Sequence, residues 1–255
     1  MIYSVFLWRN GFRRDNRVSY LLLLLAFCFH TGAMLQRGVR LDRCPVTNLY
    51  EATTFAMWAL VALYLAGGLW SRVRFLGAFA SPVLFALGVF ALMPSLDALH
   101  EARPELPVFW TSLHAALMSL SYGAFGLGSV AALMYLTQER NLKFHKLQAI
   151  FSLMPPIQRL EAAAGRLLLT GFILLTLGLV TGVVDLTHIN NPHLYRGDPK
   201  IVWSVVVWLL YLGLVAMRWW FAQGGRRFAL GAIGSFIFVL LTFWVTNILS
   251  PLHNP

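Results

Sequence analysis

The order of apolar and polar positions divides the chain into long apolar stretches separated by short polar connections. An α-helix needs roughly 20 apolar residues to cross the hydrocarbon core of a bilayer, and each stretch is close to that length. A helix also satisfies its own backbone hydrogen bonds, as the membrane interior requires. The pattern predicts an all-α, polytopic membrane helical bundle of about seven transmembrane helices, at residues 18–35, 53–70, 75–93, 109–136, 167–186, 201–221 and 229–249.

The composition supports lipid, not water, as the solvent of this chain. Apolar residues make up 58% of it and charged residues only 12%, whereas a water-soluble domain has about 25% charged residues. The mean hydropathy is +0.68, and a soluble enzyme is therefore excluded. No repeat, low-complexity tract or long linker divides the sequence, so one transmembrane domain is expected over residues 1–255.

Basic residues are distributed unevenly among the predicted connections. With the N-terminus placed inside, 14 of the 20 lysines and arginines fall on the inner side: Arg9, Arg13, Arg14, Arg17, Arg72, Arg74, Arg140, Lys143, Lys146, Arg159, Arg166, Arg218, Arg226 and Arg227. The positive-inside rule predicts this asymmetry. We therefore expect the N-terminus inside and the C-terminus outside, in a bacterial cytoplasmic (inner) membrane. The net charge of +10 is explained by this topology, and we expect no nucleic-acid partner.

The longest polar connection is predicted on the inner side, at residues 137–166. Within it, Leu147, Ile150, Phe151 and Met154 recur at helical spacing before two prolines end the pattern. An amphipathic segment of this kind is typical of a helix that lies on the membrane surface.

Two histidines lie within predicted helices, where an ionisable side chain is a candidate functional residue. His30 is toward the outer end of the first helix, and His114 is about one turn into the fourth. On the fourth helix Trp110, His114, Met118 and Tyr122 recur every four residues, which places them on one face. The alternative interpretation is that the histidines bond to neighbouring helices and the aromatic rings only pack.

A third histidine, His253, has the same predicted outer depth as His114. Two neutral imidazoles at one level can ligate a heme iron from opposite sides. The two heme propionates would then pair with cations, although the same cations could be solvated loop charges. The candidates are Arg37, Arg40, Arg43, Arg196 and Lys200.

The remaining histidines and the two cysteines form no recognisable site. No zinc-binding spacing joins them and no C-x-x-C-H heme attachment sequence occurs. No nucleophile elbow or phosphate-binding loop is present either, so hydrolase and ATPase functions have no support in the sequence. The residues concerned are His100, His145, His188, His193, Cys28 and Cys44.

Four segments, taken in order, resemble the CcsA/HemX-type cytochrome c assembly proteins, which are polytopic heme-handling membrane proteins. They are His30-Thr31-Gly32 through Arg37 with Pro45 to Glu51, Trp110 to Tyr122, Asp198-Pro199-Lys200 through Trp203, Trp208 and Tyr211, and Asn247 to His253.

The resemblance implies a heme site at the outer face, beside a tryptophan-rich loop. By order and placement, the family's two outer heme ligands fall on His114 and His253, and its first in-membrane histidine falls on His30. Trp110, Tyr195 and Asp198 are expected to line the same site. The implied partners are heme, other cytochrome c assembly membrane proteins, apocytochrome c and the lipid bilayer.

The chain departs from the family pattern in two places. Tyr195-Arg196-Gly197-Asp198-Pro199-Lys200 keeps only the end of the W-x-W-D-P-K loop, and Ala216 stands about where a second in-membrane histidine is usual. We therefore expect a divergent member that handles heme in cytochrome c biogenesis. The alternatives are a component of a cytochrome c heme lyase, a HemX-like regulator of heme synthesis and, outside the family, a small-molecule transporter.

Overall fold

The computed structural model describes residues 17–41, 49–69, 76–93, 108–144, 156–187 and 197–249. Every regular element in these ranges is an α-helix, which confirms the predicted all-α bundle. The helices are α2 (Arg17–Leu41), α3 (Leu49–Gly68), α4 (Gly77–Ala91), α5 (Val108–Phe144), α7 (Ile157–Thr187), α8 (Pro199–Trp219) and α9 (Gly225–Leu249).

Five of the described helices, α2, α5, α7, α8 and α9, are long and apolar enough to cross a membrane, while α3 and α4 contain shorter apolar stretches. Large apolar side chains cover much of the surface, for example Leu21 and Leu25 on α2, Val183 on α7 and Leu241 on α9, each more than half exposed. Water would penalise this surface but lipid does not, because acyl chains are as apolar as leucine. The chain is an integral membrane protein.

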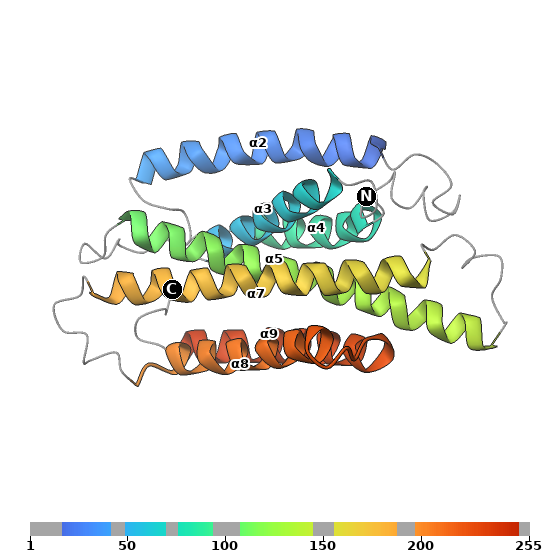
Figure 1. Cartoon of the computed structure of the whole chain (residues 1–255). Coiled ribbons are helices and arrows are strands. Elements are labelled where there is room, and N and C mark those ends of the chain that lie inside the picture. The colour runs from blue at the N-terminus through green and yellow to red at the C-terminus, as the bar shows by residue number, and fades with distance from the viewer. Residues whose placement is uncertain are drawn as a thin grey trace.

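Helices α5 and α7 form the centre of the bundle, where they cross in Figure 1. Helices α8 and α9 pack on one side of this pair. Helices α3 and α4 lie on the other side, and α2 packs outermost against them. Consistent with that peripheral place, Ser19 is the only residue of α2 that is buried.

Polar contacts between neighbouring helices define two ends of the bundle. At the first, which we call the His114 end, α2 meets α3 through Arg37 and Glu51, and α5 meets α7 through His114. At the second, the Arg218 end, Arg218 of α8 pairs with Glu161 of α7. Figure 1 shows the His114 end on the left. The helices alternate in direction, as the predicted bundle requires.

The core between α5, α7 and α8 depends on a glycine. Phe125 of α5 is fully buried and its ring stacks on Tyr211 of α8, with centroids 3.5 Å apart. The same ring lies against Gly171 of α7, where an added methyl carbon would be 2.6 Å from it. Only a residue without a side chain lets the two helices approach this closely.

Three helices, α2, α5 and α7, extend at least six residues beyond the predicted bounds. Helix α5 continues to Phe144 and α7 begins at Ile157, so the inner connection is much shorter than the predicted 137–166. The added first turns of α7 are helical because Leu160, Ala163 and Ala164 are buried in the core. Helix α2 likewise continues through Arg37, whose partner on α3 stabilises this end. The predicted surface helix at 147–154 lies outside the described residues.

A turn closed by Glu161 joins α8 to α9 at the Arg218 end. One oxygen of the Glu161 carboxylate accepts hydrogen bonds from Arg218 Nη1 and, at 3.0 Å, from the Gly225 amide at the start of α9. Gly225 has a φ of +69°, in the left-handed region that favours glycine. The carboxylate thus fixes the ends of three helices relative to one another.

Replacing Gly171 with alanine is expected to lower the free energy of unfolding by about 1–3 kcal/mol, because the new methyl group overpacks the contact with Phe125. Thermal unfolding of the detergent-purified protein, followed by the loss of the monodisperse chromatographic peak, measures this. Gly88→Ala on α4 is the matched control, since no atom lies within 4 Å of the added carbon. Equal melting temperatures for the two variants would contradict the role given to Gly171.

Candidate functional site

The best-defined feature of the His114 end is the imidazole of His114. Its Nδ1 lies 2.7 Å from the backbone carbonyl oxygen of Gly178 on α7. A carbonyl oxygen only accepts hydrogen bonds, so Nδ1 carries the proton and donates. A neutral imidazole that donates through Nδ1 has its lone pair on Nε2. This is the arrangement typical of metal-ligating histidines, whose second nitrogen is oriented by a backbone carbonyl or a carboxylate.

Small residues of α7 make the space that His114 occupies. A methyl carbon added at Gly182 would lie 2.8 Å from both Nδ1 and Cε1 of the His114 ring. One turn away, a methyl carbon at Gly178 would lie 2.9 Å from Sδ of Met118. The Gly178 carbonyl also accepts a hydrogen bond from Thr181 Oγ1 at 2.8 Å. The position of the imidazole is therefore set by backbone and by the absence of side chains.

The rest of the predicted stripe on α5 divides between two neighbours. His114 and Met118 face the glycines of α7, as described above. Tyr122, two turns from His114, approaches Trp203 of α8 with ring centroids 6.3 Å apart. Trp110 lies at the start of the helix and its ring packs edge-on against Phe109. The stripe thus connects α5 to both α7 and α8.

Asp198 begins α8 as its N-cap. Its Oδ1 accepts a hydrogen bond of 2.8 Å from the Lys200 backbone amide, and Pro199 occupies the first helical position. Capping of this kind satisfies one of the amide groups that a helix start leaves without an intrahelical partner. The Asp198 side chain is almost fully buried. The structure therefore gives Asp198 a role in fixing the segment that enters α8.

Lys200 and Trp203 extend this corner toward α9. The Lys200 ammonium lies 5.1 Å from the centroid of the Trp203 ring, a cation–π distance. The indole nitrogen of Trp203 donates to Thr242 Oγ1 of α9 at 2.7 Å. The last turns of α9, which lead toward His253, are thereby attached to the start of α8.

His30 lies on the peripheral helix α2, beside a polar contact with α3. The next residue, Thr31, accepts a hydrogen bond of 2.9 Å from the indole nitrogen of Trp58. One turn before His30, the ring of Phe27 stacks on Trp58. The His30 side chain is half-buried. Nothing in the described contacts joins His30 to His114, so the structure does not bring these two candidates into one site.

Arg37, one of the candidate partners for a propionate, already has a carboxylate partner within the protein. Its guanidinium lies 2.9 Å from Oε1 of Glu51, which is fully buried, and also lies over the ring of Tyr50. Sequence reasoning had not assigned a role to Glu51. The signal was the apolar helix that follows it, because a carboxylate buried at the start of such a helix loses its hydration and needs a cation to compensate for that loss.

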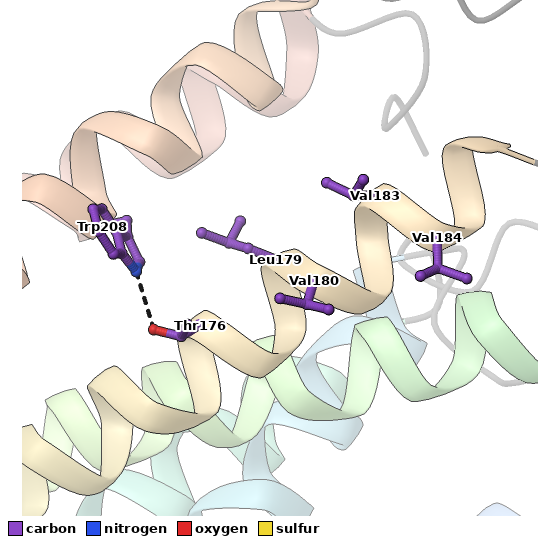
Figure 2. A pocket seen from close by; sticks show the side chains of 6 residues that line it. All are labelled: Thr176, Leu179, Val180, Val183, Val184 and Trp208. Atoms are coloured by element: carbon purple, nitrogen blue, oxygen red, sulfur yellow. Dashed lines mark hydrogen bonds between the residues drawn. The ribbon is translucent and has the colours of Figure 1, made fainter.

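An apolar groove runs between α7 and α8, with a volume of about 370 Å³ (Figure 2). Across it, the Trp208 indole nitrogen donates a hydrogen bond of 3.0 Å to Thr176 Oγ1. At 100° per residue, the lining residues Val180 and Val183 lie on the side of α7 opposite Gly178 and Gly182. The groove is thus separate from His114 and presents no ligand for a metal.

Two site residues predicted from sequence, His253 and Tyr195, lie outside the described residues. His100, His145, His188 and His193 lie outside them as well. Over the described ranges, no group of three or more histidine, cysteine, aspartate or glutamate residues could hold a metal ion.

Comparison with known proteins gives one consistent result. Residues 46–253 match the family described as cytochrome C assembly protein. The chain is 28% identical to the cytochrome c biogenesis protein CcsA of Gloeobacter violaceus, over 88% of this chain and 82% of the relative. It is 23% identical to the protein of the same name from Trieres chinensis, over 98% of this chain and 89% of the relative. The matched region contains His114 and six of the seven described helices in full, all but α2. The chain belongs to the cytochrome c assembly protein family.

Proposed function

We propose that this protein handles heme during cytochrome c assembly and holds it at the His114 end of the bundle, with His114 and His253 as the two iron ligands. The observation that carries the proposal is the hydrogen bond from His114 Nδ1 to the Gly178 carbonyl oxygen. In the neutral ring this bond places the proton on Nδ1 and leaves the lone pair on Nε2, the form in which an imidazole binds iron.

The place of α9 supports the second ligand. The bond between Trp203 and Thr242 keeps the end of α9 beside the start of α8, and Tyr122 links that corner back to α5. His253 follows α9 by four residues. In this proposal His253 reaches the open side of the His114 end, while His30, on α2, acts earlier in passing heme outward.

The residues around the ligands have separate tasks. Trp110 supplies apolar cover at the start of α5, and Tyr195 covers the ligand from the segment before α8. Asp198 acts through its cap, which fixes the direction in which that segment leaves α8. Because Arg37 is engaged by Glu51, the propionates pair with Arg40, Arg43, Arg196 or Lys200.

An assembly role is favoured over regulation of heme synthesis. The relatives described above are named for cytochrome c biogenesis. A chain that holds heme would meet apocytochrome c and other membrane assembly proteins at the same end. Vinyl groups of heme and cysteine thiols of the apocytochrome would be joined there if the chain is part of a heme lyase.

Removing either iron ligand is expected to abolish six-coordinate heme. Wild type, His114→Ala, His253→Ala and His30→Ala are purified after heme-replete expression, and reduced and oxidised absorption spectra are recorded at equal protein. The first two variants should lose the six-coordinate bands, and added imidazole should restore them by filling the vacated position. His30→Ala should lower heme content with unchanged coordination. Unaltered bands in both ligand variants, or a heme-free wild type, would refute the assignment.

Moving the His114 ring without removing it should also weaken binding. In Gly182→Ala the new methyl group lies 2.8 Å from the ring, which must turn away from the Gly178 carbonyl. Loss of the orienting partner of a metal-bound histidine typically costs 10–100-fold in affinity, so heme transfer to apomyoglobin should be about tenfold faster. Gly213→Ala on α8 is the control, because its added carbon meets open space. Identical transfer rates in the two variants would remove the support that this proposal takes from α7.

The His114 end is expected to face the outside of the membrane. The described basic residues Arg140, Lys143, Arg159, Arg226 and Arg227 gather toward the Arg218 end, as the positive-inside rule requires of the inner side. A reporter enzyme that works only outside the membrane should be active when fused after Pro255 and inactive when fused near Arg72. The opposite result would place the heme site on the inner face.

A further inference from the structure

The turn between α8 and α9 presents three consecutive large aromatic side chains outward. Trp219, Trp220 and Phe221 have exposed fractions of 48%, 85% and 66%. Trp220 and Phe221 are much more exposed than the tryptophans of the bundle interior, such as Trp203 at 6%. Indole rings prefer the headgroup level of a bilayer, where one edge is apolar and the other is wet. The turn therefore has the chemistry of a segment that rests at the membrane surface.

Two arginines lie in the first turn of α9, separated from Phe221 by residues 222–225. Arg226 and Arg227 are both exposed. Cations at this position are unfavourable, because the first turn of a helix carries the positive end of its dipole. The arginines would be stabilised by an anion that approaches from outside the bundle.

The described carboxylates at the Arg218 end do not supply that anion. Glu161 is engaged by Arg218 and by the Gly225 amide. Glu139 forms no ion pair with Arg226 or Arg227 among the contacts of the described residues. Two positive charges are thus left facing the surface beside the exposed aromatic rings.

The turn is held in one conformation. The Trp220 and Phe221 amides both donate to the Ala216 carbonyl, and the Gln223 amide donates to the Met217 carbonyl. The ring of Trp219 lies against Gly165 of α7, 3.6 Å from where a methyl group would be. Glu161 binds the Gly225 amide, so the backbone of the turn is also attached to the start of α9.

We propose that this surface, residues Trp219, Trp220, Phe221, Arg226 and Arg227, binds the headgroup of an anionic phospholipid. The guanidinium groups take the phosphate and the rings lie among the upper acyl carbons. Anionic leaflets attract basic segments that lie next to spanning helices, and here the segment is preorganised. The proposal does not depend on heme or on the assignment of His114.

The test uses the full-length protein in phosphatidylcholine vesicles that contain either dibrominated phosphatidylglycerol or dibrominated phosphatidylcholine. Bromine quenches tryptophan fluorescence on contact, and because the chain has nine tryptophans, the signal of the turn is the part of the quenching that is lost in Trp220→Phe. We expect stronger quenching by the anionic lipid in the wild type and loss of that preference at high salt. Trp220→Phe should remove much of the anion-dependent part of the signal.

Arg226→Gln with Arg227→Gln should weaken binding of the anionic lipid by about fivefold per arginine. The matched control is Arg159→Gln with Arg166→Gln, which removes the same charge from exposed positions on α7 outside this surface. The control should keep the preference. Equal quenching by both lipids in the wild type, a preserved preference in the α9 variant or an equal loss in the control would each overturn the proposal.

Discussion

The close approach of α5 and α7 is the contact on which the other features of this protein depend. Both helices are longer than a bilayer crossing, and they pack through glycines of α7, so that side chains of α5 lie almost on the α7 backbone. At Gly171 this space receives the ring of Phe125, and at Gly182 it receives the imidazole of His114. The packing that stabilises the core is thus the packing that orients the candidate ligand.

Polar chemistry is divided between the two ends of the bundle. At the His114 end, Glu51 is paired with Arg37, and Asp198 accepts a hydrogen bond from the Lys200 amide. These contacts of buried carboxylates fix the helix ends relative to one another. At the Arg218 end, a single carboxylate, Glu161, gathers the contacts, and the surrounding arginines remain at the surface. The two ends therefore differ in where their charged groups lie: Glu51 and Asp198 are buried and paired, whereas Arg226 and Arg227 are exposed.

The helices could be predicted from sequence because lipid leaves a simple signal, a long apolar run. The residues at which the helices begin and end could not be predicted, because contacts with neighbouring helices decide them. Helix α2 continues past its apolar part because Arg37 finds Glu51 on α3. The early turns of α7 look polar, with Arg159 and Glu161, yet Leu160 and Ala163 bury one face of them. His114 could be selected as a candidate by its place in a helix, but its partner could not, because a backbone carbonyl has no signature in the sequence.

Helix α2 is attached to the bundle by a few polar bonds, given its small buried surface. Tyr20 donates to the Leu65 carbonyl, Trp58 donates to Thr31, and Arg37 pairs with Glu51. In lipid, apolar residues on the outer side of such a helix are interchangeable, because each meets only acyl chains. Natural variation should therefore accumulate freely along the outer side of α2, while Tyr20, Thr31 and Arg37 tolerate few replacements. The helix that carries His30 can diverge quickly in sequence and still keep its place beside α3.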